Sequence, residues 1–389
     1  MNICTIININ KLFFYKCESM ALKFIYDPRK IVASITVDLS SSTIERRKKL
    51  HLFSDDPLET GRKIPALLPM VDYESFQLTT DSNWMLDGHF SAINEKDGLV
   101  FTDRILSDTN FNFQQIYSTD RDTSLRCLDG QTITLLSDNK EIKQLPGEIG
   151  VACSVEPSNW GAFLSRIVPK AMAFKNAGIK KILVHAHHPN QKDILKWVGY
   201  NEKDLIIQNP KMHYGLEVAH FISEPASALF IHQSARNALR SLAEKVPKAN
   251  FGKLLYVSRS AGVASRSKRQ LINEKELEEA LQKLGFQVLI PDMFSVSEQI
   301  AAFRDADFIV GPSGAGLFNA VFCKPGTQLI DIESSSSAWS YGHANLFSSL
   351  DLNYGFVWGK VEDASGEGVH KSYFVDVNAV VERVKSMLG

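Results

Sequence analysis

The sequence predicts an α/β protein with a β-rich N-terminal region. Short apolar runs separated by polar turns dominate the first 150 residues, and strand and helix patterns alternate from Ser158 onward. A unit that reads strand, glycine-rich turn, helix, turn and strand then spans Phe308–Glu333. Alternating strands and helices are typical of parallel sheets that carry helices on their faces.

Length and composition limit the classes of function. A chain of 389 residues is long enough for two domains, each with its own core. The net charge of −1 gives no general attraction to nucleic acid. The five cysteines are scattered and form no C-x-x-C pair, so neither a disulfide framework nor a cysteine metal site is expected. These features favour a reducing, cytoplasmic location.

The N-terminal region supplies mainly strands. Apolar runs of strand length lie at Ile31–Val37, Leu67–Val71, Gly98–Phe101 and Thr132–Leu136. Asp-Gly pairs signal turns between such runs. Residues 1–19 are interpreted as an extension, because their apolar stretch is too short and too interrupted for a membrane span. The rest of the chain is divided into a first domain, 20–222, and a second, 223–389.

The first alternating α/β run follows Ser158. Apolar residues at helical spacing predict a helix over Trp160–Lys175. The elements expected after it are a strand at Lys181–His185, a helix at Gln191–Val198 and strands at Leu205–Ile207 and Leu216–Phe221.

The second run begins after Pro225. It predicts helices at Ser227–Lys245 and Ser295–Arg304, with strands at Lys253–Val257 and Phe286–Ile290. Between these strands lies a further helix, for which Asn273 is the expected N-cap and Glu276 the partner in a capping box.

The glycine-rich turn follows the apolar run Phe308–Val310. Gly311, Gly314 and Gly316 allow backbone amides to approach a ligand closely, and the helix after them points its N-terminus at the same place. The spacing matches neither the P-loop nor the dinucleotide fingerprint. Taken alone, the turn is equally consistent with anion binding and with ordinary turn chemistry.

A basic loop follows the strand that ends at Val257. Its cations are Arg259, Arg266, Lys268 and Arg269. Arginine guanidinium groups match phosphate oxygens, although a solvent-exposed loop with ordinary surface charge is the alternative. Ligands of open parallel sheets bind beyond the carboxyl ends of strands, where both this loop and the glycine turn are expected. Together they favour a phosphorylated ligand.

Two further groups could carry chemistry. Asp331 and Glu333 end the strand after the glycine turn, where a carboxylate can hold ribose hydroxyls or simply face solvent. His185, His187 and His188 follow the strand of the first run. A neutral imidazole there could act as a general base, but these residues could equally be loop residues without a chemical role. No acidic partner at metal-ligand spacing accompanies them.

These motifs resemble the C-terminal half of the family 61 glycosyltransferases. The family pattern joins Ser-Arg after a strand, a further Arg before Asn-Glu-x-Glu, and a G-x-H-G-A-G-L-x-N turn. The matching positions are Ser258, Arg259, Arg269, Asn273, Glu274, Glu276, Gly311, Gly314, Ala315, Gly316, Leu317 and Asn319. The resemblance covers roughly residues 155–389 and is clearest in the second half.

The resemblance implies two Rossmann-like domains that face each other across a cleft, the GT-B arrangement, with the acceptor side in 20–222 and the nucleotide-sugar donor in 223–389. It implies an inverting transfer to a hydroxyl acceptor in polysaccharide or glycoconjugate synthesis. The residues assigned to the donor are Arg259, Arg269, Ser313, Gly314, Ala315, Gly316, Asn319 and Glu333. His187 and His188 are the catalytic candidates. No metal is expected, because arginines would offset the diphosphate charge.

Departures from the pattern keep other functions open. Ser313 stands where the family has a histidine, and Ala162 and Phe163 replace its His-Trp pair. Serine can donate a hydrogen bond but cannot carry a proton at neutral pH. The alternatives are a non-catalytic nucleotide-sugar-binding or scaffold protein of a polysaccharide assembly system, and a phosphometabolite enzyme unrelated to sugars. The expected partners are a nucleotide sugar and a glycan or other hydroxyl acceptor, with peripheral membrane association through a lipid-linked acceptor and no nucleic acid.

Overall fold

In the computed structural model, contacts divide the chain into two compact units, which are described separately. Unit 1 comprises residues 1–40 and 75–225, and unit 2 comprises residues 41–74 and 226–389. The structure describes residues 74–76, 142–153, 158–209, 212–222, 225–226, 230–260, 269–335, 340–361 and 371–388, and before residue 142 the strands given below. Residues 41–74, which the sequence analysis placed in the first domain, group with unit 2, where β5 (His51–Leu52) pairs in parallel with β20 (Asn353–Val361).

The predicted β-rich N-terminal region is confirmed. One antiparallel sheet has the order β1-β2-β3-β11-β10, formed by β1 (Thr5–Ile9), β2 (Leu12–Cys17), β3 (Met20–Tyr26), β10 (Leu125–Arg126) and β11 (Ile133–Leu135). A short pair consists of β4 (Thr43–Ile44) and β6 (Met70–Val71). Three of the four apolar runs coincide in part with β6, β9 and β11, and the fourth, Ile31–Val37, lies outside the described residues.

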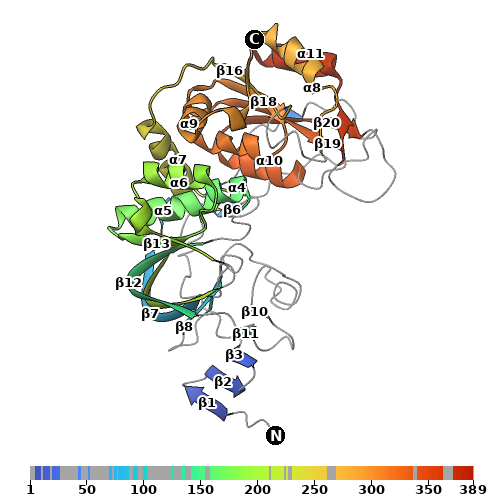
Figure 1. Cartoon of the computed structure of the whole chain (residues 1–389). Coiled ribbons are helices and arrows are strands. Elements are labelled where there is room, and N and C mark those ends of the chain that lie inside the picture. The colour runs from blue at the N-terminus through green and yellow to red at the C-terminus, as the bar shows by residue number, and fades with distance from the viewer. Residues whose placement is uncertain are drawn as a thin grey trace. The chain divides into compact units, whose positions relative to one another are not determined.

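The main sheet of unit 1 is mixed and curls into a half-barrel (Figure 1). Its parallel part is β14 (Leu205–Ile207), β13 (Lys181–Val184), β12 (Ile142–Ala152) and β15 (His213–Ile222), in that spatial order. Beyond β15 it continues antiparallel with β7 (Leu78–Leu86), β8 (Ser91–Asn94) and β9 (Val100–Thr102). The expected parallel α/β run is therefore present, extended by an antiparallel edge.

Strand β12 was not predicted, because Pro146 and Gly147 interrupt its apolar pattern. The strand accommodates them where its register against β15 shifts between Leu145 and Glu148. Gly147 has φ of +78°, a value that favours glycine, and its amide donates to Glu217 Oε2 at 2.7 Å. The strand is thereby kept continuous through a pair of residues that usually ends one.

The helices of unit 1 follow the predicted order. The first begins as α4 (Trp160–Ala162), widens into a π-helical segment, η3 (Phe163–Ile167), and continues as α5 (Val168–Asn176). The widened turn lies just before Pro169, whose nitrogen cannot donate a helical hydrogen bond. Helix α6 (Pro189–Val198) ends at Gly199, and a short 3₁₀ turn, η4 (Glu202–Asp204), precedes β14.

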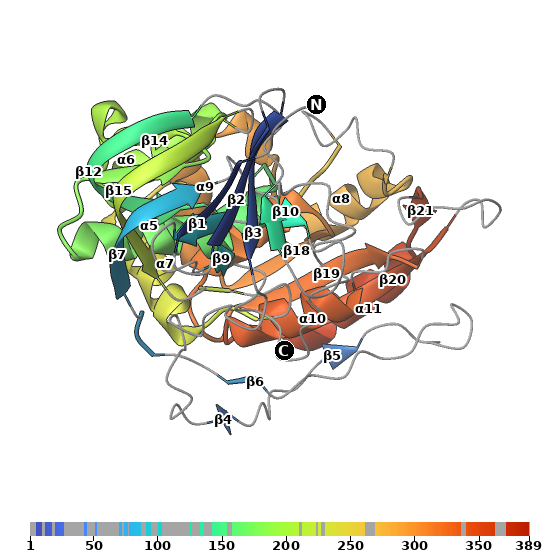
Figure 2. The same ribbon diagram turned by 90° about the horizontal axis from the view of Figure 1, so that it is seen from below.

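Unit 2 is built on a parallel sheet with the spatial order β17-β16-β18-β19-β20. Figure 2 labels β18, β19 and β20 of this sheet. Its strands are β16 (Leu254–Val257), β17 (Gln287–Leu289), β18 (Phe308–Pro312), β19 (Gln328–Ser334) and β20, with the short β21 (Tyr373–Phe374) antiparallel at the edge. After β16 the chain forms β17 beside one edge of β16, and it then crosses over to form β18 beside the opposite edge of β16. The sheet therefore reverses direction between β16 and β18, which is its topological switch point.

Helices cover both faces of this sheet. Helices α8 (Glu274–Gln282) and α11 (Val377–Leu388) cover one face, where Tyr256, Phe308 and Ile330 belong to the same apolar core. Helices α7 (Gln233–Lys245) and α9 (Val296–Asp305) contact each other and the 3₁₀ helix η7 (Ala315–Phe322), and α10 (Ser340–Ser349) packs on β20. A 3₁₀ turn, η6 (Pro291–Met293), lies between β17 and α9.

Two local predictions in unit 2 were wrong. The helix expected from Ser227 begins at Gln233, because Ile231 instead pairs with Ala226 in an antiparallel bridge. Asn273 is the N-cap of α8, as predicted, but it forms no capping box with Glu276. Its side chain instead donates to the Val375 carbonyl at 2.8 Å and accepts from the Val375 amide at 3.2 Å. Asn273 therefore joins α8 to the segment before α11.

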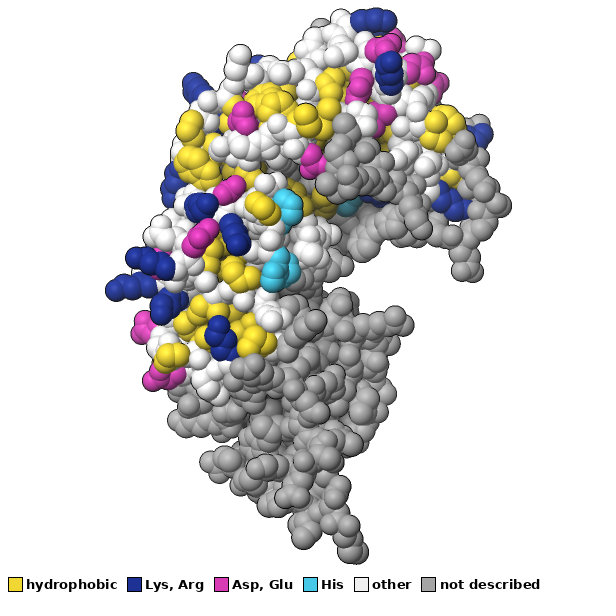
Figure 3. Space-filling model, viewed as in Figure 1, with side chains coloured by type: hydrophobic (Ala, Val, Ile, Leu, Met, Phe, Trp, Pro, Cys, Tyr) yellow, Lys and Arg dark blue, Asp and Glu magenta, His cyan; other side chains and the backbone are white. Residues whose placement is uncertain are grey.

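Among the helices that the structure describes, none has the length and apolar character needed to cross a bilayer. On the face shown in Figure 3, Lys and Arg side chains alternate with Asp and Glu side chains over the coloured surface. This mixture agrees with the near-zero net charge of the chain.

Candidate functional site

The glycine turn and the start of the basic loop meet at the switch point of unit 2. Arg259 follows the carboxyl end of β16, and Ser313 and Gly314 follow the carboxyl end of the neighbouring β18. Open α/β sheets bind ligands in the crevice at this position, because the chains leave the two strands in opposite directions.

Both predicted arginines contact the turn. The Nη1 group of Arg259 donates to the Ser313 carbonyl, and the Nη2 group of Arg269 donates to the same oxygen at 2.9 Å. A Cβ atom added to Gly314 would lie 2.5 Å from Arg259 Nη1. The structure therefore brings Arg259, Arg269, Ser313 and Gly314 together, whereas Arg266 and Lys268 lie outside the described residues.

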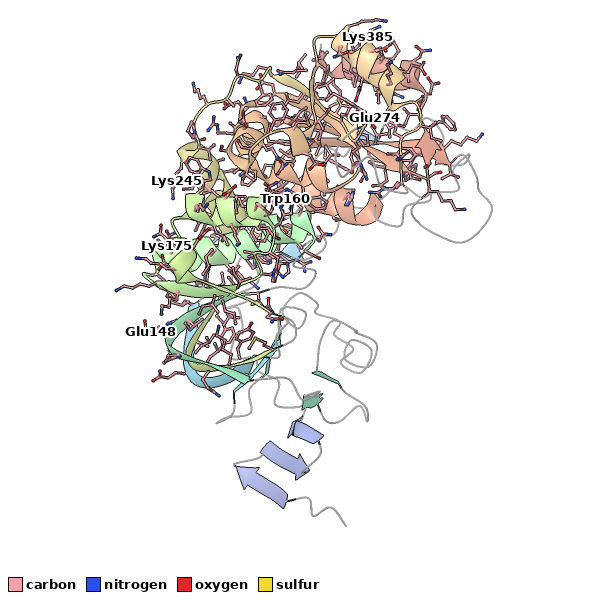
Figure 4. The ribbon with its side chains drawn as sticks, viewed as in Figure 1. Glu148, Trp160, Lys175, Lys245, Glu274 and Lys385 are labelled. Atoms are coloured by element: carbon pink, nitrogen blue, oxygen red, sulfur yellow. The ribbon has the colours of Figure 1, made fainter. Side chains whose placement is uncertain are left out.

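Helix α8 fixes the backbone of Arg259. The Arg259 amide donates to Glu274 Oε1 at 2.7 Å, and the Tyr256 hydroxyl donates to the same oxygen at 3.2 Å. Glu274 is buried at the start of α8, where Figure 4 labels it. Burial raises the pKa of Glu274, and the Arg259 amide counters that shift. One carboxylate thus holds the end of β16 in place.

The two arginines form a partly buried positive pair. Burial lowers the pKa of Arg259, and the neighbouring charge of Arg269 lowers it further. The Nε and Nη2 groups of Arg259 have no hydrogen-bond partner within the part of the chain that the structure describes. An anion at this position would therefore gain charge-assisted hydrogen bonds and reduce the repulsion between the cations.

The turn presents amide groups beside this pair. The first hydrogen bond of η7 joins the Leu317 amide to the Gly314 carbonyl at 3.0 Å, so the amides of Ala315 and Gly316 precede the helical pattern. Ala315 is exposed, and Gly314 and Gly316 are half-buried. Gly314 has φ of 156° and ψ of −175°, a region in which side chains are strained. The amides of the glycine turn are thus accessible, and a ligand can approach this backbone closely.

A buried polar cluster lies directly beneath the turn. His343 Nδ1, from α10, is 3.0 Å from Ser313 Oγ and 3.2 Å from both Asp331 Oδ2 and Glu333 Oε2. The other oxygen of Glu333 accepts from Arg269 Nη1 at 3.1 Å. The Tyr354 hydroxyl donates to Asp331 Oδ2 at 3.0 Å. The cluster therefore connects the turn, β19, α10 and β20.

The charges in this cluster depend on one another. Burial disfavours the imidazolium form of His343, but hydrogen bonds and charge from Asp331 and Glu333 outweigh it and raise its pKa to about 9. Burial also disfavours the ionised form of Glu333, yet His343 and Arg269 bring its pKa down to about 2. Burial raises the pKa of Asp331. At neutral pH, His343 is therefore a cation held between carboxyl groups.

The same three side chains offer ligand atoms for a cation, within 4.8 Å of one another. The sequence predicted no metal here, because the pattern that places Asp331 and Glu333 together does not include His343. Imidazolium and guanidinium charges from His343 and Arg269 offset the two carboxylates, as a cation would. This balance of charges favours a protonated histidine in the cluster.

Asn319 and Glu333, also assigned to the donor, do not face the turn surface. Asn319 is 1% exposed, and its Nδ2 donates to Gln299 Oε1 at 3.1 Å, which joins η7 to α9. Glu333 is 1% exposed and lies in the cluster with Arg269 and His343. Their contacts support the turn from within, so neither is presented to a ribose hydroxyl from the surface.

The histidines of unit 1 lie at the carboxyl end of β13. His187 Nε2 donates to the Gln208 carbonyl at 2.8 Å, which leaves Nδ1 as the acceptor of that ring in its neutral form. His188 is the N-cap of α6, and its Nδ1 accepts from the Asn190 amide at 3.3 Å. The His185 and His187 rings meet edge to face, and burial followed by the charge of His187 lowers the pKa of His185 to about 4.

The other departures from the family pattern lie in the core of unit 1. Phe163 is fully buried and stacks on Trp160 with 5.8 Å between ring centroids. Ala162 is 8% exposed. Both side chains act in packing, and neither has a group that could bind a proton or a phosphate.

A comparison with protein-family models identified the family. The model described as glycosyltransferase 61 matches residues 160–330. Residues 160–330 belong to glycosyltransferase family 61. This region contains both arginines, the glycine turn and the unit 1 histidines, so membership supports glycosyltransferase activity. A search of curated proteins found no match.

Sequence reasoning missed His343, and with it the cluster that supports the turn. No motif marks this residue, because Ser313, Asp331 and His343 belong to three different elements and their separations follow no fixed spacing. Contacts of this kind are determined by tertiary packing. The one available signal was a lone histidine in the helical segment after Glu333.

Proposed function

We propose that the protein transfers a sugar from a nucleotide-diphospho-sugar to a hydroxyl acceptor, in polysaccharide or glycoconjugate synthesis, with inversion at the anomeric carbon. Family membership supports the transferase class, and the switch point of unit 2 supports a diphosphate donor. The proposal includes the GT-B arrangement of two domains, a cytoplasmic location and a lipid-linked or glycan acceptor.

The convergence of Arg259, Arg269 and the turn is the observation that carries this proposal. Two guanidinium groups donate to the Ser313 carbonyl, beside amides that precede the first helical hydrogen bond. A diphosphate seated there would accept from the remaining N–H groups of Arg259 and from the amides of Ala315 and Gly316. The same groups would stabilise the charge that develops on the leaving nucleoside diphosphate. We further propose that these cations replace a divalent metal ion.

In the transfer step, the acceptor oxygen attacks the anomeric carbon and the bond from that carbon to the diphosphate oxygen breaks. The nucleoside diphosphate leaves with the electron pair, and the acceptor proton passes to a base. His187 and His188 remain our candidates for that base. Of the two, His187 has the freer geometry, because its Nδ1 can accept while Nε2 is held by Gln208.

A thermal-shift screen over nucleoside diphosphates and their sugar conjugates, with and without EDTA, tests the donor site. At least one ligand should raise the melting temperature of the wild type, with no effect of the chelator. Arg259→Ala should remove the shift. Lys283→Ala is the matched control, because Lys283 is an exposed cation at the C-cap of α8, away from the turn. A shift that persists in Arg259→Ala would remove this residue from the site.

A non-catalytic nucleotide-sugar-binding protein is the second candidate. Ser313 and Ala162 stand where the family has histidines, and neither side chain can carry a proton at neutral pH as imidazole can. Measurement of product formation from stabilising nucleotide sugars, with and without hydroxyl acceptors, separates the two. Binding without hydrolysis or transfer would favour this candidate and refute the transferase.

A further inference from the structure

His343 is held from every side, which fixes the direction of its Nδ1 atom. The ring meets Phe318 of η7 and Phe347 of α10 edge to face, with centroids 5.5 and 5.7 Å away. Nδ1 therefore points toward Ser313 Oγ and the two carboxylates, all within 3.2 Å. The side chain is 12% exposed. Such an orientation leaves the ring little freedom to turn elsewhere.

Two carboxylate oxygens surround Nδ1 of His343, and they require this nitrogen to carry a proton. Carboxylate oxygens only accept hydrogen bonds, so an unprotonated Nδ1 would face Asp331 and Glu333 with lone pair against lone pair. A proton on Nδ1 turns both into favourable contacts. The charged groups around the ring are Asp331 and Glu333 of β19 and, through Glu333, Arg269, while the Tyr354 hydroxyl of β20 donates to Asp331.

Glu333 connects this proton to the anion site. One of its oxygens meets His343, and the other accepts from Arg269 Nη1, whose Nη2 donates to the Ser313 carbonyl. Ser313 makes hydrogen bonds on two sides. Its hydroxyl contacts His343, and its carbonyl accepts from both arginines. His343 thus contacts the same residue that the two arginines contact, but from the buried side.

We propose that His343 is a positioning residue of the pyrophosphate site: its Nδ1 contacts the Ser313 hydroxyl and forms an ion pair with Glu333, and through them it sets the glycine turn and the Arg269 guanidinium toward the ligand. This role rests on the proposed function. His343 does not touch the ligand itself. Its proton takes the place that a structural cation would otherwise occupy between Asp331 and Glu333.

Binding of inorganic pyrophosphate, measured by calorimetry, tests the assignment with three variants. His343→Leu removes the donor, and its dissociation constant should rise by about tenfold or more. His343→Asn keeps an N–H group near the position of Nδ1 but carries no charge, so it should restore only the part of the affinity that depends on the hydrogen bond. Ser349→Ala on the same helix is the control, because it loses hydrogen bonds with the Ile231 amide and the Leu346 carbonyl, neither of which belongs to the His343 cluster.

A pH profile provides a readout that a merely structural role would not change. The wild type should lose affinity as the pH rises through about 9 and the His343 imidazolium loses its positive charge, relative to His343→Asn, which carries no charge over this range. Ionisation of pyrophosphate is common to both proteins and cancels in the ratio. Parallel profiles would overturn the proposal even if His343→Leu failed to fold.

Other outcomes are equally decisive. Unchanged affinity in folded His343→Leu would overturn the positioning role while leaving the donor site intact. Failure of the wild type to bind pyrophosphate would overturn the proposed function, and this role with it. If Zn²⁺ or Mn²⁺ stabilised the wild type but not His343→Leu, and EDTA weakened pyrophosphate binding, the cluster would be a metal site instead.

Discussion

Replacement of Gly314 by alanine should disable the anion site. Gly314 adopts φ of 156°, where a side chain is strained, and an added Cβ would lie 2.5 Å from Arg259 Nη1 and 3.1 Å from its Cζ. The first contact is shorter than any that a Cβ tolerates. The guanidinium must therefore move away from the Ser313 carbonyl, or the turn must shift.

The magnitude has two parts. Backbone strain of this kind costs about 1–3 kcal/mol of folding stability. Loss of one charge-assisted hydrogen bond to a phosphate costs about 1.5–3 kcal/mol of binding free energy, which corresponds to a rise in the pyrophosphate dissociation constant of roughly ten- to a hundredfold. Denaturant titration gives the first quantity, and calorimetry gives the second.

Gly326→Ala separates the two effects. Gly326 has φ of +84°, so alanine is strained there as well, but nothing lies within 4 Å of the added Cβ. This variant should lose stability and keep its affinity for pyrophosphate. If Gly314→Ala bound pyrophosphate within about twofold of the wild type, the turn would not be part of the site.

Three further predictions follow from single contacts. Arg269→Ala leaves the buried carboxylate of Glu333, 1% exposed, without its guanidinium partner. The variant should lose about 3 kcal/mol of unfolding free energy in a urea titration, and a loss below about 1 kcal/mol would contradict this. The folded-state pKa of His343, about 9, lies above its unfolded value, so its stabilising contribution is complete below about pH 6.5 and disappears as the pH rises through about 9. Melting temperatures over that range should fall more in the wild type than in His343→Asn, and equal slopes would refute the assignment. His188→Ala loses the N-cap of α6 and should cost about 1 kcal/mol, which His188→Asn should largely recover in the same titration.

The alternation of strands and helices was predictable because it follows from local apolar periodicity. The strand Leu205–Ile207 coincides with β14, and the strand after Asp307 is β18. The anion site could also be predicted from the sequence. Parallel strands place their carboxyl ends at one edge of the sheet, and Arg259 and Gly314 each follow such an end.

The remaining features depend on contacts between distant segments. Strand β12 could not be predicted, because Pro146 and Gly147 interrupt its apolar pattern. The strand includes them through a shift in its register against β15. Asn273 bonds to Val375 rather than within its own helix, because α8 lies beside the segment that enters α11. His343 could not be assigned to the site, because its partners lie 12 and 30 residues away along the chain.

Hydrogen exchange at the glycine turn tests the central claim most directly. The claim is that a diphosphate binds to the amides before the first helical hydrogen bond of η7, between Arg259 and Arg269. A bound nucleoside diphosphate should slow exchange in the segment Gly314–Gly316 of the wild type and leave the segment around Gly326 unchanged. Ligand binding confirmed by calorimetry, with no slowing at Gly314–Gly316, would contradict the account.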